Sequence, residues 1–215
     1  MNPNTYGVPR TVEKNKLEFI VAPEVSGFGG ELDGSSDFAR VVPALPTVGV
    51  RYGLSERWDI GGRFSNVTGT SGDIKWNAIR TPAVDVALDP GLQLYRVFGV
   101  GSSDVEDPSE DAITVFIVHM PLMFGFNLGK SVSLVPTFGV SYAVAPDPPP
   151  GASDIELSQI VHGAFGRVGL GVDFRLSDAV ALHPEVTLLR GIGEMDGYLV
   201  YMGGLGFVFG HLPEY

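Results

Sequence analysis

The sequence predicts an all-β protein, an up-and-down antiparallel barrel of about ten strands. Hydrophobic residues recur at every second position in segment after segment, which is the periodicity of a strand with one apolar face. Glycine (29 residues) and proline (16) are abundant and only 18% of the residues are charged, a composition that suits strands and turns better than helices. Because the composition does not change midway, we take residues 1–215 as one domain: an N-terminal extension (1–15), the barrel (16–210) and a C-terminal tail (211–215).

In the first half of the chain, each predicted strand has an apolar parity and a parity of small, polar or charged residues. The hairpin over 48–66 shows this best, because Val48, Val50 and Tyr52 share one face and Arg51 lies on the other. The other apolar sets are Leu17, Phe19 and Val21 (strand 16–23), Ile74, Trp76 and Ala78 (strand 73–80), and Val84, Val86, Leu88, Leu92 and Leu94 (one long strand over 84–98).

The five strands of the second half repeat the pattern. Their apolar sets are Phe116, Val118, Met120, Leu122, Phe124 and Phe126; Leu134, Phe138, Val140 and Tyr142; Val168, Leu170, Val172 and Phe174; Val180, Leu182, Val186 and Leu188; and Leu199, Tyr201, Leu205, Phe207 and Phe209. Ten is an even number of strands, and several exceed the five or six residues of an average strand.

Short and long connections alternate along the chain. Three short ones share one form, a leucine, three turn residues and a hydrophobic residue, at 54–58, 128–132 and 176–180, and a fourth falls near 81–83. The longer connections cover 24–40, 99–111 and 146–158, with smaller ones at 67–72 and 191–197. This alternation predicts a meander with the short turns and both termini at one rim and the longer connections at the other.

Parity alone does not decide which face points outward, but the content of the two faces does. The apolar parity is almost entirely Leu, Val, Phe and Trp, whereas the other parity is rich in Gly, Ser and Ala with one or two charges per strand, too few for a water-exposed surface. An apolar face turned outward makes a transmembrane barrel. The reverse arrangement, a soluble ligand-binding barrel with an apolar lumen, is the alternative fold.

The aromatic residues of the apolar parity gather near the strand ends. Those near the short turns are Tyr52, Trp58, Phe126, Phe174 and Phe209, and those near the opposite ends are Phe98, Tyr142 and Tyr201. Such a distribution is typical of the two aromatic girdles at membrane interfaces.

The chain resembles a small bacterial outer-membrane β-barrel protein over about Lys16 to Gly210. The segment that carries the resemblance most sharply is Gly204-Leu-Gly-Phe-Val-Phe209, which is similar to the C-terminal assembly signal of that family; Met202 and the tail after Gly210 depart from it. The resemblance implies a bacterial outer-membrane location, short periplasmic turns, longer extracellular connections, and lipid and lipopolysaccharide as partners of a monomer. Because MNPNTYGVPR is polar from its second residue, we expect a signal peptide to have been removed.

In this orientation thirteen ionisable residues line the lumen. They are Glu18, Arg51, Asp59, Arg63, Asp73, Lys75, Asp85, Asp89, Arg167, Asp173, Arg175, His183 and Glu185. Seven acids against five strong bases can mostly pair, so we favour a salt-bridge network that braces the wall over a narrow channel for small, possibly cationic solutes. The short turn at 176–180 places Asp173 opposite His183, a structural contact or a pH-sensitive latch.

The longer connections carry most of the net charge of −11. Their acids include Glu24 in the first connection, and they could hold divalent cations that bridge to lipopolysaccharide. Arg40, Arg96 and Arg190 lie on the apolar parity near the same rim, where an arginine could pair with lipid phosphates. The acidic charge argues against a nucleic-acid partner.

The sequence supports no catalytic centre, metal site or cofactor. Ser158 and His162 are the residues to weigh for a hydrolase of lipid A or peptides acting at the rim, but no orienting third group is recognisable. His183 and Glu185 are two candidate metal ligands where three or four are usual, and the chain has no cysteine. An adhesin or receptor that uses its surface connections is the remaining alternative function.

Overall fold

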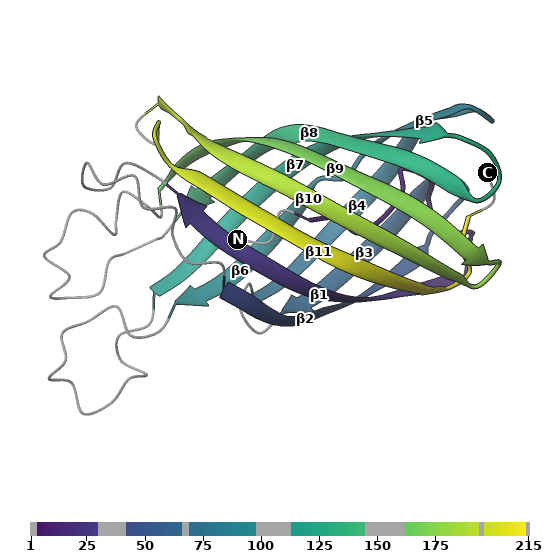
Figure 1. Ribbon diagram of the computed structural model, residues 1–215, viewed down its shortest axis with the longest axis horizontal. Helices are drawn as coiled ribbons and strands as arrows, with labels where there is room; N and C mark the ends of the chain where they lie inside the picture. Colours follow the sequence, from purple (N-terminus) through teal and green to yellow (C-terminus); the bar gives the residue numbers. More distant parts are fainter. Residues whose placement is uncertain are drawn as a thin grey trace, which may run out of the picture.

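The computed structural model describes residues 4–29, 42–65, 69–97, 113–144, 162–193 and 196–213. The strands in these residues are β1 (Leu17–Gly29), β2 (Val42–Gly53), β3 (Trp58–Ser65), β4 (Gly69–Arg80), β5 (Val84–Leu88), β6 (Gly91–Val97), β7 (Ile113–Asn127), β8 (Val132–Val144), β9 (Gly163–Ser177), β10 (Val180–Ile192) and β11 (Leu199–Gly210) (Figure 1). Within the described ranges, no helix is long and apolar enough to cross a bilayer.

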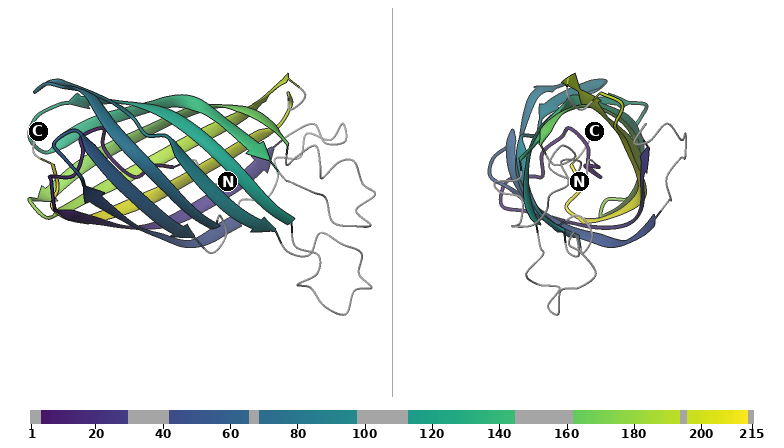
Figure 2. Two further views of the ribbon diagram at one scale, coloured as in Figure 1. Left: turned by 180° about the vertical axis from the view of Figure 1, so that it is seen from behind. Right: turned by 90° about the vertical axis from the view of Figure 1, so that its left-hand side faces the viewer.

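The strands form a closed antiparallel barrel, which confirms the predicted fold class (Figure 2). Apart from β5 and β6, which do not pair with each other, strands that follow one another in the sequence are paired, and β1 pairs with β11 to close the ring. β5 and β6 both lie between β4 and β7, so together they fill one position and the ring has ten positions. We call the end with the short turns, such as 54–57 and 128–131, the turn rim, and the end where β1 stops and β2 starts the loop rim.

The prediction of one continuous strand over 84–98 was wrong. The strand stops at Leu88 and resumes at Gly91 because Pro90 has no N–H to give to the ladder. Neighbouring strands still cover the break: the Asp89 N–H donates to the Pro121 carbonyl oxygen (3.0 Å), and the Ile74 N–H donates to that of Pro90 (3.0 Å). The side-chain parity is unchanged across the gap, and Asp89 still points inward.

The first strand is longer than predicted. It does not end at Pro23 but runs to Gly29, with a register shift between Ala22 and Glu24 in its pairing with β2. Glu24 therefore belongs to the wall of the barrel and not to an acidic connection. Its buried carboxylate accepts a hydrogen bond of 2.7 Å from the Thr47 hydroxyl.

The apolar parity faces outward, as the composition of the two faces predicts. Leu17, Phe64, Leu122 and Leu170 are between 37% and 55% exposed, while the polar residues of the opposite parity are buried inside. The arrangement of a soluble barrel, with an apolar lumen and a polar outside, is therefore excluded. A polar-lined interior within an apolar outer surface is the architecture of an outer-membrane β-barrel.

The N-terminal segment lies inside the barrel, which the sequence did not predict. Viewed along the axis, the described residues at the start of the chain lie within the ring (Figure 2). Apart from the partly exposed Gly7, every residue from Asn4 to Val12 is buried, whereas Glu13 to Lys16 are exposed. We refer to residues 4–12 as the internal segment.

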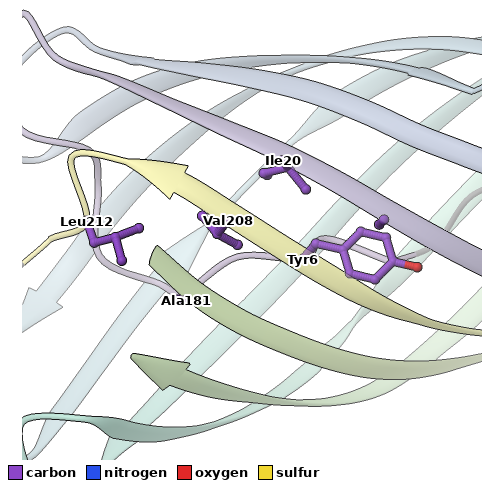
Figure 3. Packing of buried hydrophobic residues seen from close by; sticks show 6 residues of the cluster. Tyr6, Ile20, Ala181, Val208 and Leu212 are labelled. Carbon is purple, nitrogen blue, oxygen red and sulfur yellow. The ribbon is translucent and has the colours of Figure 1, made fainter. Parts of the chain in front are cut away.

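Two apolar clusters pack the internal segment against the wall. Tyr6 belongs to a cluster with Ile20, Ala22, Ala181, Val208 and Leu212, and Figure 3 shows its ring lying along β11. Val8 packs with Met123 and Val135. The core of this protein is thus the filled lumen of the barrel.

Candidate functional site: the filled lumen

Arg51 is the centre of an ionic network in the turn-rim half of the lumen. Its Nη2 atom lies 2.6 Å from Asp59 Oδ1 and 3.2 Å from Asp89 Oδ1. Its Nη1 atom lies 2.6 Å from Asp73 Oδ1. The guanidinium of Arg51, in β2, thus contacts three carboxylates, which come from β3, from β4 and from the break between β5 and β6. The network therefore links neighbouring strands of the barrel.

Lys75 and Arg63 complete this network on the adjacent strands. Lys75 Nζ lies 3.3 Å from Asp59 Oδ2, and Arg63 Nη2 lies 3.5 Å from Asp73 Oδ2. All of these side chains are at most 9% exposed. Charges buried to this degree are tolerated only when they are paired, and each of these has an opposite charge within 3.5 Å, although Arg63 Nε has no hydrogen-bond partner among the described residues.

A second ionic group lies across β9 and β10. Asp173 Oδ1 is 3.4 Å from His183 Nδ1, the neighbours that the turn at 176–180 predicts. The register differs locally from that prediction, because Val180 pairs with Ser177 before the pairing shifts by one residue. His183 Nε2 lies 3.7 Å from Glu185 Oε2, and Arg167 Nη2 lies 3.8 Å from Glu185 Oε1, which is too far for a hydrogen bond.

Glu185 obtains its closest hydrogen bonds from the internal segment. Its carboxylate accepts from the backbone N–H of Thr5 (3.0 Å) and of Tyr6 (2.7 Å), and from the Thr5 hydroxyl (3.1 Å). The backbone of Tyr6 is in the left-handed region (φ 46°), which is uncommon for a bulky residue. Two consecutive N–H groups converging on one anion are the arrangement of a backbone nest.

Other wall residues hold the remaining backbone groups of the internal segment. Arg63 donates to the carbonyl oxygen of Asn4, and Lys75 Nζ donates to that of Val8 (3.0 Å). The N–H of Val12 donates to Asp59 Oδ2 (2.9 Å). The ionic network and the internal segment therefore share their anchors.

Arg10 supplies a base that the sequence-based account of the lumen lacked. Its Nε donates to Asp85 Oδ2 (2.8 Å), and its Nη2 donates to the carbonyl oxygen of Thr81 (2.8 Å). Nearby, the Asn127 amide also donates to Asp85 (2.9 Å). The predicted surplus of lumen acids over bases is thus met by Arg10 and by backbone N–H groups of residues 5, 6 and 12.

Two inward glycines of β11 make room for Tyr6. A Cβ atom on Gly204 would overlap the Tyr6 hydroxyl, and one on Gly206 would lie 3.1 Å from Tyr6 Cβ. The Asn4 amide donates to the Tyr6 hydroxyl (2.7 Å) and fixes the end of the ring. The glycines that carry the family resemblance therefore also form the socket for this ring.

Toward the loop rim, one side of the lumen is lined mainly by apolar residues. The buried apolar side chains there are Val115, Ile117, Ala143, Phe165, Leu189, Val200 and Met202, all at most 8% exposed. They come from β7, β8, β9, β10 and β11. Buried polar side chains lie at the same level, because Ser26 pairs with Met202 and Gln93 pairs with Ile117.

The thirteen residues predicted for the lumen all lie on the inward parity; twelve are buried, and Arg175 is partly exposed. Arg175 donates to the Pro213 carbonyl oxygen at the turn rim and, with Glu18 and Asp173, borders a small pocket. Sequence reasoning missed Tyr6, Arg10 and Glu24. The surplus of acids and the inward glycines of β11 were the available signals for the first two.

The predicted aromatic girdles are on the outer face where the structure describes them. Tyr52, Trp58, Phe126, Phe174 and Phe209 are exposed near the turn rim, and Tyr142 is exposed near the loop rim. The Tyr201 ring lies over Gly27 of β1. Phe98 lies outside the described residues. Trp58 stacks on Trp76, with their ring centroids 5.8 Å apart.

The rim residues are only partly covered by the structure. Arg190 is on the outer face with its side chain 75% exposed, 3.2 Å from Asp196. Arg40, the side chain of Arg96, Ser158 and most acids of the long connections lie outside the described residues. His162 is exposed, with its ring edge-on to Tyr142.

Among the described residues, no group of three or more His, Asp or Glu side chains could hold a metal ion.

The comparisons with known proteins found similar solved structures and no family. No family model matches the chain, and neither does any curated protein. Similar solved structures include the attachment invasion locus protein Ail of Yersinia pestis (TM-score 0.40, 9% identity, covering 92% of this chain and 99% of that chain). Others are the translocator domain of the autotransporter NalP from Neisseria meningitidis (0.49, 12%, 92% and 89%) and the outer membrane protease OmpT from Escherichia coli (0.46, 11%, 93% and 98%).

Proposed function

We propose that this protein is an outer-membrane barrel whose lumen is closed at rest, a structural barrel that anchors long acidic connections at one face of the membrane. The observation that carries the proposal is the occupied lumen. The internal segment is hydrogen-bonded to residues of β3, β4, β5 and β10, and the ionic network fills the space beside it. A conducting barrel needs a continuous water-filled path, and the described residues packed in the turn-rim half of the lumen obstruct such a path.

The membrane location is supported by the outer surface. Large hydrophobic side chains cover it, and a surface of this extent exposed to water would drive association. Cells that make the protein should yield it in the outer-membrane fraction, and extraction should require detergent. Recovery in the soluble fraction without detergent would contradict the membrane assignment.

Planar-bilayer recording tests the closed lumen. The full chain, inserted in a bilayer at neutral pH, should give a current equal to that of the protein-free membrane, while an open porin measured alongside conducts. Insertion is verified by flotation of the protein with vesicles of the same lipid. A steady ohmic conductance from the inserted full chain would favour the narrow-channel function instead.

Contact with lipopolysaccharide is the finer part of the proposal. Arg190 supports it, because its guanidinium is exposed on the outer face at the loop rim. Replacing Arg190 by alanine should weaken binding of the detergent-solubilised protein to lipopolysaccharide micelles, and Mg²⁺ should strengthen binding if the acidic connections hold cations. Unchanged binding in both experiments would count against this partner.

A further inference from the structure

We propose that the inner wall of the barrel is a peptide-binding site, and that the internal segment is its resident and exchangeable ligand. The ligand class is a short peptide that presents two convergent backbone N–H groups, an aromatic side chain and, four residues after it, an arginine. In this chain the pattern is Thr5-Tyr-Gly-Val-Pro-Arg10. The proposal adds a binding activity to the closed barrel and does not depend on which surface partner that barrel has.

The wall recognises the main chain of the segment, not merely its side chains. Backbone groups of Asn4, Thr5, Tyr6, Val8 and Val12 bond to charged side chains of the wall: Arg63, Glu185, Lys75 and Asp59. Charge-assisted bonds of this kind are roughly twice as strong as neutral ones. The wall thus supplies the hydrogen bonds that a buried main chain without regular secondary structure requires.

Three side chains of the segment occupy separate subsites. Tyr6 lies in the socket of Gly204 and Gly206 beside the apolar cluster of β1, β10 and β11 (Figure 3). Val8 packs on Met123 and Val135. Arg10 reaches the Asp85 carboxylate and the Thr81 carbonyl oxygen. An anchor of this kind in each of several pockets is how peptide sites obtain specificity.

The segment has few covalent constraints that would keep it in the site. Among the described residues it joins β1 through the exposed residues 13–16 at the turn rim, and the sequence has no cysteine to tether it. If it leaves, Arg167 is already 3.8 Å from Glu185 and can take over the carboxylate. The site lies in the turn-rim half of the lumen, next to the point where residues 13–16 leave it and Lys14 pairs with Gly53 at the end of β2. A competing peptide would therefore come from the turn-rim side.

Exchange is tested on the full chain with the pair Tyr6→Ala and Arg10→Ala, which removes two anchors from the ligand and none from the wall. A single cysteine at Val8 (V8C) reports departure through its reaction with a water-soluble thiol reagent, and Lys14→Cys, an exposed position, gives the unprotected rate. In the otherwise unaltered chain V8C should react at least about tenfold more slowly than K14C, and the double substitution should remove most of that protection.

A fluorescent peptide with the sequence of residues 4–13 then tests the vacated wall. It should bind the doubly substituted barrel saturably. It should bind the unaltered chain at least about tenfold more weakly, because the resident ligand competes. A peptide whose own tyrosine and arginine are replaced by alanine should not bind. Absence of saturable binding to a barrel whose V8C is exposed would overturn the proposal. Persistent protection of V8C in the double variant would also overturn it, because Tyr6 and Arg10 would then not be the anchors.

A cross-link keeps the test decisive if the double variant does not fold. The Gly206 Cβ position lies 3.1 Å from Tyr6 Cβ, slightly below the roughly 3.5–4.5 Å of a disulfide, so after a small shift Tyr6→Cys with Gly206→Cys should oxidise to a cross-linked barrel. The oxidised form should not bind the peptide, and reduction should restore weak binding. Two thiols that stay free under oxidant, or equal binding by the oxidised and reduced forms, would contradict the site. A conducting full chain would refute the closed lumen while leaving peptide binding to be decided by these measurements.

Discussion

The side chains of the lumen contribute unequally to the stability of the fold, and we expect Arg51 to contribute most. Replacing it with methionine removes the partner of three buried carboxylates, and unpairing buried charges typically costs about 3–5 kcal/mol. We expect a clearly lower urea midpoint for unfolding in lipid vesicles. Arg51→Lys should recover only part of the loss, because an ammonium cannot make the forked contacts.

Arg190→Ala is the matched control, since its ion pair with Asp196 is largely exposed and such pairs contribute about 0–1 kcal/mol. An unfolding midpoint for the Arg51 variants equal to that of Arg190→Ala would contradict the central role of Arg51.

Gly204 is the second residue whose substitution should lower the stability of the fold. Its alanine variant places a methyl group on the Tyr6 hydroxyl, and overpacking of this kind typically costs about 1–3 kcal/mol. The neighbouring Gly203→Ala should be nearly neutral, because a Cβ there meets its nearest atoms at 3.8 Å. Combining Gly204→Ala with Tyr6→Ala should cost less than the sum of the two, which the unfolding free energies of a double-mutant cycle will measure.

At the scale of elements, the internal segment behaves as part of the wall although it has no regular secondary structure. The N–H groups of Thr5, Tyr6 and Val12 donate to buried carboxylates, so their exchange with deuterium should be slowed about as much as that of β1 amides. The exposed turn at 55–57 serves as the fast-exchanging reference in the same experiment. Exchange of residues 5–12 at the rate of that turn would contradict the packing described here.

The strands could be predicted because a half-buried strand has a strict period of two, and this fixed the inward parity of residues as far apart as Glu18 and Glu185. Several boundaries were wrong. Pro90 breaks a strand and Pro23 falls inside one, while β2 and β4 begin earlier than predicted, at Val42 and Gly69. The internal segment has no periodicity, since it is held by one carboxylate or ammonium at a time. No local pattern indicates such contacts, and only the acid surplus and the inward glycines hinted at them.

At the scale of the whole molecule, the outer surface should be in contact with lipid. The chain has two tryptophans, Trp58 and Trp76, and they stack on the outer face near the turn rim. Brominated lipids should therefore quench most of the intrinsic tryptophan fluorescence, most strongly with bromine near the headgroups, where aromatic girdles lie. The aqueous quencher acrylamide should have a weak effect. The opposite ranking of the two quenchers would contradict the orientation of the barrel.

The seam between β1 and β11 joins the first and last strands that the structure describes, and Tyr6 touches β11 from within at Gly204 and Gly206. The barrel can therefore close only after β11 has been synthesised. A nascent polypeptide halted before Leu199 leaves β1 and β10 with unpaired edges and the Tyr6 ring without its socket. Biogenesis of this protein consequently depends on the twelve residues of β11, which complete the wall and enclose the internal segment in one event.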